Sequence, residues 1–316
     1  MGLGVASIQN ILELKNLGYF KDLNSVMEIG SQEIHLKVLD LKELFEIAGL
    51  DKNLIDTFPN VEKWPFKPRC SSRHLFKALG FNNYQSIDLN GELGAVVHDL
   101  NKPFEDKSKF NKFDIVTDFG SCEHVFNIAE SYKTMHNLVK PGGYLIIEQQ
   151  TIKGNGFFTF DESFYEGIAA ANGYKIIYSS YLVRTGEKTK NGSWHEFHIP
   201  RNQGLLNILD YSKLRSAKAG DTALNIYGVF QKMKDSEFKM PYQGGIHNDD
   251  IYNHVAGFNR GYLKQTMDYL YIPSATKTIE DASLGIILKS LFKWSKKKVR
   301  NIIRKLIISP LHHRHH

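Results

Sequence analysis

Cysteine is scarce in this chain of 316 residues, which has only Cys70 and Cys122. Two cysteines cannot build the disulfide framework of a small secreted domain, and they show no zinc-ligand spacing. The first ten residues also lack the basic and then apolar segments of a secretory leader. No apolar run reaches the roughly 18 residues that a membrane-spanning helix needs. We therefore expect a cytoplasmic protein.

Acidic residues are missing from the C-terminal segment. Residues 282–316 contain nine Lys and Arg but no Asp or Glu, whereas the whole chain has a net charge of +6. The remainder holds 31 basic and 34 acidic residues, so the folded body is slightly acidic. A nucleic-acid partner is unlikely on these grounds, because nucleic-acid binding needs basic residues on the folded surface.

The basic segment has the pattern of an amphipathic helix. Over 284–308, most apolar residues recur near one helical face and most Lys and Arg lie elsewhere. This pattern is typical of a helix that lies on an anionic membrane surface. A helix docked on its own domain or on a second subunit would show a similar pattern, so the oligomeric state stays open.

Short apolar segments alternate with helical patterns along the first 232 residues. Strands are expected at 26–29, 85–88, 95–98, 114–117, 144–148, 174–181 and 223–231. Helices are expected at 8–17, 71–80, 125–138 and 162–172. This alternation predicts an α/β fold whose sheet is covered by helices on both faces.

The same pattern divides the chain into segments. Residues 1–232 form the predicted domain, with insertions at 35–70 and 183–222. An extension follows at 233–281, and the basic amphipathic tail occupies 282–316.

The stretch 140–148, KPGGYLIIE, places a Pro-Gly-Gly turn between a helix end and a buried strand. Four strand ends precede it, each with an acidic or glycine-containing turn. In this order they resemble the class I S-adenosylmethionine-dependent methyltransferases. The resemblance implies a doubly wound, mostly parallel seven-stranded sheet with a reversed last strand. It also implies a methyltransferase with S-adenosylmethionine at the carboxyl ends of the strands.

The first strand end, Glu28-Ile29-Gly30-Ser31, would approach the cofactor. Gly30 lets the backbone come close to a ligand, and Ser31 can donate to its carboxylate. This loop has fewer glycines than the family pattern, so a non-catalytic cofactor-binding or assembly protein remains an alternative. The missing Gly-x-Gly-x-x-Gly also counts against a nicotinamide-dependent oxidoreductase, which is the other alternative.

The next two strand ends are expected to hold the nucleoside. By the resemblance, Asp88 accepts hydrogen bonds from both ribose hydroxyls, with Leu89 beside it. Asp99 accepts from the adenine amino group, and Leu100 offers its backbone N–H and an apolar face. Both aspartates could instead shape a turn or begin a helix.

The fourth strand end, Asp118-Phe119, is expected to line the methionine end of the cofactor. The following Glu123-His124 matches a Glu-His-hydrophobic sequence of the family. His124 is a candidate general base, although a structural role is the more frequent one for such a histidine.

Residues 194–198, WHEFH, lie in the second insertion. His195 is a candidate on a flap that faces the acceptor, and no metal site is expected because no set of partner ligands is apparent. The acceptor is expected to be a small molecule or a glycan- or lipid-linked group.

Overall fold

The computed structural model describes residues 2–152, 155–200 and 223–241. These residues belong to one compact unit, Met1–Ile272. Its main sheet has eight strands: β2 (Ser25–Ile29), β4 (Asn83–Asp88), β5 (Val96–Val97), β6 (Phe113–Phe119), β7 (Val139–Ile152), β8 (Tyr174–Lys188), β9 (Trp194–Pro200) and β10 (Ala223–Lys232). A second sheet pairs β1 (Gly2–Leu3) with β3 (Glu33–Ile34). The tail at 282–316 lies outside the described residues.

The main sheet is doubly wound and mostly parallel, as predicted. Its strand order is β5-β4-β2-β6-β7-β10-β8-β9. The five strands from β5 to β7 pair in parallel, and β10 runs antiparallel to both β7 and β8. The reversed last strand is therefore confirmed. The predicted number of seven strands is wrong by one, because β9 extends the sheet from within the expected insertion at 183–222.

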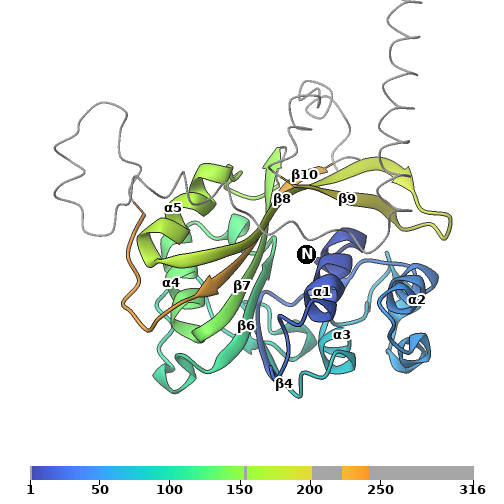
Figure 1. The fold of residues 1–316 in the computed structure, drawn as a ribbon, viewed down its shortest axis with the longest axis horizontal. Helices are drawn as coiled ribbons and strands as arrows, with labels where there is room; N and C mark the ends of the chain where they lie inside the picture. The colour runs from blue at the N-terminus through green and yellow to red at the C-terminus, as the bar shows by residue number, and fades with distance from the viewer. Residues whose placement is uncertain (1, 153–154, 201–222, 242–316) are drawn as a thin grey trace, which may run out of the picture. The chain divides into compact units, whose positions relative to one another are not determined.

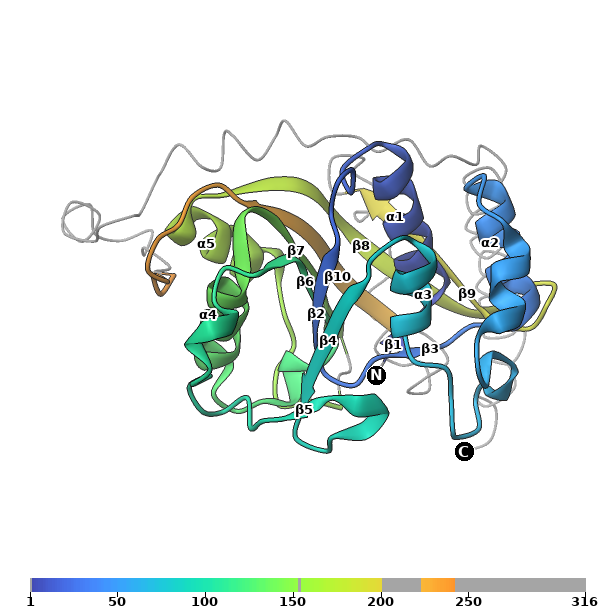
Figure 2. The ribbon, with the colours of Figure 1, turned by 90° about the horizontal axis from the view of Figure 1, so that it is seen from below.

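Helices cover both faces of this sheet. Figures 1 and 2 show one group of helices on one side of the sheet and a second group on the other. The first group is α1 (Val5–Asn16), α2 (Val38–Ile47) and α3 (Arg73–Ala78), and the second is α4 (Ile128–Leu138) and α5 (Glu162–Asn172). The parallel strands are consequently buried on both faces, which explains why they read as continuous apolar runs in the sequence.

The bounds of α5 follow from its two ends. The Asp161 side chain accepts a hydrogen bond from the Ser163 N–H at 2.8 Å, which satisfies one of the free donors of the first turn. Gly173 then ends the helix with φ +63°, a left-handed conformation that favours glycine. The sequence predicted both ends of this helix.

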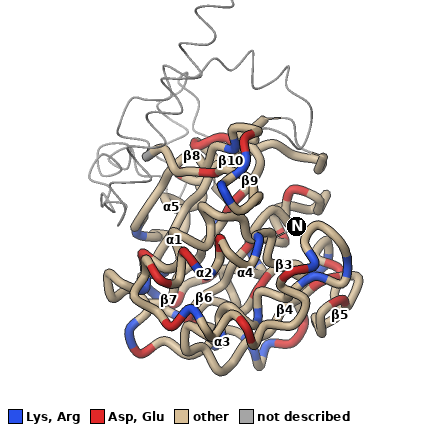
Figure 3. Tube along the Cα trace, turned by 90° about the vertical axis from the view of Figure 1, so that its right-hand side faces the viewer, with Lys and Arg blue, Asp and Glu red and all other residues tan. Residues whose placement is uncertain are grey.

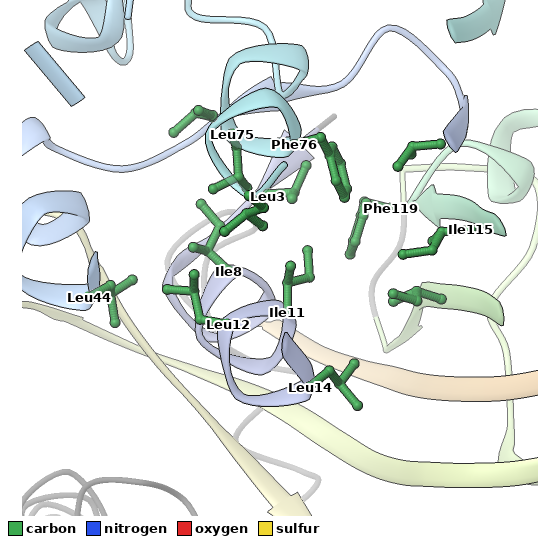
Figure 4. Packing of buried hydrophobic residues seen from close by; sticks show 14 of the residues in the cluster. Leu3, Ile8, Ile11, Leu12, Leu14, Leu44, Leu75, Phe76, Ile115 and Phe119 are labelled. Atoms are coloured by element: carbon green, nitrogen blue, oxygen red, sulfur yellow. The ribbon is translucent and has the colours of Figure 1, made fainter. Parts of the chain in front are cut away.

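The apolar core on the first face centres on α1. Figure 4 shows α1 side chains packed between α3 and β6, with Phe119 of β6 among them. A separate apolar cluster packs α4 and α5 against the other face. The N-terminal helix is thus part of the domain.

The Pro-Gly-Gly segment differs from its prediction. It was expected to be a helix-to-strand turn, but β7 already begins at Val139. The pairing with β6 shifts between Val139 and Tyr144, so that four residues of β7 stand opposite Asp114 alone. Gly142 has φ +81°, which permits this bulge. The glycines therefore distort a strand that is already paired.

The two predicted insertions contact each other. The first contains α2 and two 3-10 helices, η1 (Lys52–Thr57) and η2 (Val61–Lys63). Asp40 of α2 is buried and accepts hydrogen bonds from Thr189, Asn191 and Ser193 in the β8–β9 turn.

None of the helices in the described part of the chain has the length and apolar character to cross a membrane.

Candidate functional site

The carboxyl ends of β4, β2 and β6 meet at one edge of the sheet, because these strands are parallel neighbours. The loops that follow them are joined by hydrogen bonds. The Gly30 N–H donates to the Ile87 carbonyl at 2.7 Å, and the Ser31 N–H donates to Asp88 Oδ2 at 2.7 Å. The structure therefore brings Gly30, Ser31 and Asp88 together, and their contact with the cofactor stays a prediction.

Gly30 is required by a close approach of two loops. Its φ is +90°, and a Cβ built on it would lie 2.0 Å from Ser121 Oγ. The Ser121 hydroxyl occupies this space and donates to the Ile29 carbonyl at 2.7 Å. Gly30 is therefore the glycine that allows the β2 and β6 loops to contact each other.

Gln32 completes this contact, and sequence reasoning missed it. Its amide nitrogen donates to the Ile29 carbonyl and to Ser121 Oγ, each at 2.8 Å. The side chain is fully buried, and its Oε1 has no hydrogen-bond partner in the structure. A polar residue two positions after a glycine carries no signal in one sequence that would have marked it.

Asp88 is half-buried and keeps capacity to accept hydrogen bonds. Its Oδ2 receives the Ser31 N–H and its Oδ1 receives the Asn90 N–H at 3.2 Å. A carboxylate oxygen can accept more than one donor, so both oxygens remain able to bind a hydroxyl. Two apolar side chains nearby are exposed, Leu89 by 66% and Val97 by 68%. An acid beside exposed apolar surface fits a nucleoside, which presents hydroxyls and a flat base.

Asp99 lies just after β5 and is partly exposed. Its Oδ1 accepts from the Asn101 N–H at 3.0 Å and from the Asn101 side-chain amide at 2.9 Å. These hydrogen bonds lower the pKa of Asp99, so it is ionised at neutral pH. Leu100 is buried in the apolar cluster on the α4 side, and so its side chain contributes to the core.

Asp118 and Phe119 are both buried, and their place at the methionine end of the cofactor stays a prediction. Asp118 accepts from the Ser121 N–H at 2.8 Å, and it also accepts from the Cys122 N–H and the Gln149 side chain. Burial raises the pKa of Asp118 to about 6. Asp118 thus shapes the turn after β6, and Phe119 packs against α1 (Figure 4).

Glu28 is likewise fully buried. Its carboxylate accepts hydrogen bonds from the hydroxyls of Ser72 and Tyr84. Burial raises the pKa of Glu28 to about 7. Ser72 directly precedes α3, and Tyr84 lies on β4. The Glu28 carboxylate therefore links the start of α3 to the sheet by hydrogen bonds. Its place at the cofactor stays a prediction: the two hydroxyls engage Oε2, and Oε1 has no hydrogen-bond partner in the structure.

His124 follows the β6 loop in a 3-10 helix, η5 (Cys122–His124). Its Nε2 lies 3.5 Å from Glu123 Oε1, and about a third of the side chain is exposed. Burial lowers the pKa of His124, so the imidazole is neutral at pH 7. Glu123 is itself buried, with Oε2 accepting the Gln150 N–H at 2.9 Å. The pair stands beside the loop contact at Ser121.

His195 lies elsewhere, on the edge strand β9. The strands β7, β10 and β8 separate it from the β6 loop, so the two catalytic candidates are not brought together. Its Nδ1 is buried without a hydrogen-bond partner. His198 points to the opposite face, where it contacts the Ala6 carbonyl and the Ser180 hydroxyl. The two histidines therefore do not converge on one ion.

One family model and several solved structures are similar to this chain. Residues 8–212 match a family model described as a methyltransferase domain. No curated protein matches the chain. Among solved structures, a putative methyltransferase from Bacillus halodurans C-125 is 11% identical over 71% of this chain and 98% of that chain, with a TM-score of 0.36. A SAM-dependent methyltransferase from Archaeoglobus fulgidus is 12% identical over 71% and 94%, with a TM-score of 0.33.

Proposed function

The chain belongs to the methyltransferase domain family, and on this premise we propose that it transfers a methyl group from S-adenosylmethionine to a small-molecule or glycan- or lipid-linked acceptor. One observation carries the proposal. The half-buried Asp88 carboxylate, fixed by the Ser31 N–H at 2.7 Å, stands beside the exposed Leu89 and Val97. This combination suits the ribose hydroxyls and the adenine of the cofactor.

The bound cofactor would supply a methyl group activated by its attachment to a sulfonium. The neutral thioether would be the leaving group. The protein's task is then to align the acceptor with that methyl group and to exclude water. The β6 loop is suited to this task because Asp118, Ser121 and Gln32 hold it rigidly against Gly30. His124 is neutral and lies beside this loop, so it is the candidate among the described side chains for accepting a proton from a hydroxyl acceptor, although we expect its main role to be support of the loop.

The charge distribution supports a small acceptor over a nucleic acid. Figure 3 shows Lys and Arg interspersed with Asp and Glu along the described part of the chain. A duplex or single strand would be held by basic residues gathered along one face.

Calorimetry tests the proposal directly. S-adenosylhomocysteine should bind the purified full chain at one site with micromolar affinity, and NAD should not displace it. Asp88→Ala should weaken this binding. No detectable binding at millimolar S-adenosylhomocysteine would show that the proposal is wrong. Binding without methyl transfer to any fraction of a cell-extract acceptor pool would favour the non-catalytic alternative.

A further inference from the structure

Two exposed phenylalanines flank the β6 loop. Phe126 is 73% exposed and Phe157 is 67% exposed. Their rings meet edge to face with centroids 5.7 Å apart. Exposed Phe side chains placed in contact leave a sizeable apolar surface in water, and such surface commonly marks a binding site.

The backbone fixes this pair beside the candidate site. The Glu123 carbonyl accepts hydrogen bonds from the Phe157 N–H at 2.7 Å and from the Phe158 N–H at 3.3 Å. A Cβ on Gly156 would lie 2.4 Å from the same carbonyl, so only glycine allows the approach. The loop that follows β7 is thereby held against η5. Phe126 itself comes two residues after His124.

The exposed pair is also anchored in the core. Ring contacts continue inward. The ring centroids of Phe126 and Phe158 are 6.4 Å apart, and those of Phe158 and Phe160 are 6.5 Å apart. Phe160 is buried and contacts Phe164 of α5 at 5.0 Å. This series of rings limits how far the outer two can turn away from solvent, so their exposure is built into the fold.

We propose that Phe126 and Phe157 bind the flat ring of an aromatic acceptor and hold its hydroxyl beside the β6 loop. This inference rests on the methyl transfer proposed above and narrows its acceptor to one chemical class. Aromatic rings pair favourably in edge-to-face and offset arrangements, so a third ring can extend the existing pair. The position is suitable because the pair adjoins the loops at the carboxyl ends of β6 and β7.

The nearby polar groups favour an aromatic acceptor over a sugar. A sugar presents several hydroxyls, each of which needs a hydrogen-bond partner when it is buried. The Asn127 N–H and side-chain amide already donate to Asn101, at 2.9 and 3.0 Å. Glu123 is 5% exposed, so its carboxylate offers little surface to the hydroxyls of a sugar. Phe has no polar atom in its side chain.

Binding measurements with two diols test the inference. Calorimetry on the full chain with saturating S-adenosylhomocysteine should detect binding of 2,3-dihydroxynaphthalene, while methyl β-D-glucopyranoside should bind at least tenfold more weakly. Phe126→Ala and Phe157→Ala should each weaken naphthalenediol binding about tenfold, since each removes one ring contact. Phe66→Ala is the matched control, because Phe66 is 75% exposed and lies in the first insertion. It should leave the affinity unchanged.

The outcomes separate this inference from the proposed function. If S-adenosylhomocysteine binds but the naphthalenediol does not, or if the glucoside binds more tightly, the aromatic assignment is wrong and methyl transfer stands. An equal loss in Phe66→Ala would also overturn it, because the effect would then not belong to this pair. If S-adenosylhomocysteine itself fails to bind, both proposals fall.

Discussion

The acids at the ends of the inner strands differ from those at the ends of the outer strands. Glu28 on β2 and Asp118 on β6 are fully buried; protein donors engage both oxygens of Asp118 and the Oε2 of Glu28. Asp88 on β4 and Asp99 after β5 are partly exposed; both accept hydrogen bonds from amides of adjacent turns or loops, and Asp99 also pairs with Lys102. All four acids lie at or near the carboxyl end of a strand. Their difference in burial therefore arises from the place of each strand in the sheet.

The comparison assigns different tasks to similar residues. A buried carboxylate whose hydrogen bonds are satisfied internally fixes the protein, and a partly exposed one retains lone pairs for a ligand. Burial raises the pKa of Glu28 to about 7 and that of Asp118 to about 6, whereas hydrogen bonds from Asn101 lower the pKa of Asp99. The inner acids therefore stabilise the fold at this edge of the sheet, and the outer acids keep oxygens that can accept hydrogen bonds from a ligand.

The largest effect should come from an inner acid. Asp118→Ala would leave three buried donors unpaired, on Ser121, Cys122 and Gln149. Each unpaired donor costs roughly 1–3 kcal/mol, so we expect the free energy of unfolding to fall by about 3 kcal/mol or more. Urea unfolding followed by circular dichroism measures this change.

Asp118→Asn is the matched control for that variant. The amide keeps one oxygen acceptor and nearly the same volume, so it should lose clearly less stability than the alanine variant. If Asp118→Ala unfolds at the same urea concentration as the wild type, the buried carboxylate does not organise the β6 loop.

An outer acid should show the reverse behaviour. Asp88→Ala should weaken S-adenosylhomocysteine binding about tenfold or more, because a ligand hydroxyl would lose its acceptor at a cost of roughly 1–3 kcal/mol. Asp99→Ala should weaken it less, since its expected partner is a single amino group. Calorimetry gives the affinities, and urea unfolding should show that both variants stay nearly as stable as the wild type. Equal affinity for Asp88→Ala and the wild type would remove Asp88 from the site.

The sequence predicted the strand ends well and their exposure poorly. The positions of Gly30, Asp88 and Asp118 follow from local patterns, because apolar runs and turn residues depend on neighbours in the chain. Whether a side chain is buried depends on contacts with distant residues. Asp118 meets Gln149 from β7, and Gly30 meets Ser121 from the β6 loop. Those contacts exist only in the folded sheet.

The same limit applies to Phe126, Phe157 and the strand β9. Phe126 and Phe157 read as ordinary apolar residues in the sequence, and only the fold places them together in solvent. Residues 194–198 lie on β9, whose pairing with β8 depends on residues earlier in the chain. Local pattern thus predicted the element type better than it predicted the function of a side chain.

The inner acids should also make stability depend on pH. The ordinary pKa of a glutamate is 4.5, and that of Glu28 is about 7 in the folded protein. Between these values the folded state keeps a proton that the unfolded state releases, so the free energy of unfolding falls as pH rises from about 4.5 to 7. Glu28→Gln should remove on the order of 1 kcal/mol of this fall.

Asp99→Asn supplies the comparison for the pH measurement. The pKa of Asp99 lies below its ordinary value of 3.8, so this residue stays ionised throughout the same window and contributes no slope. Urea unfolding at half-unit steps of pH should therefore give a flatter curve for Glu28→Gln and an unaltered one for Asp99→Asn. Identical slopes in wild type and Glu28→Gln would contradict the raised pKa.

The smallest effect concerns His124, which combines both kinds of environment. It follows an inner strand, yet a third of its side chain is exposed, and its contact with the buried Glu123 is 3.5 Å long. A contact of this length between a neutral imidazole and a carboxylate contributes about 0.5 kcal/mol. If His124 mainly supports the loop, His124→Asn should lower stability by that amount and lower turnover less than tenfold, with a matching loss of cofactor affinity. If it accepts the acceptor's proton, turnover should fall by about 10²-fold at unchanged cofactor affinity. We expect the structural result, because the imidazole points toward the Glu123 carboxylate, which is already engaged by Gln150. Kinetics and calorimetry on the same variant distinguish the structural role from the proton-accepting role.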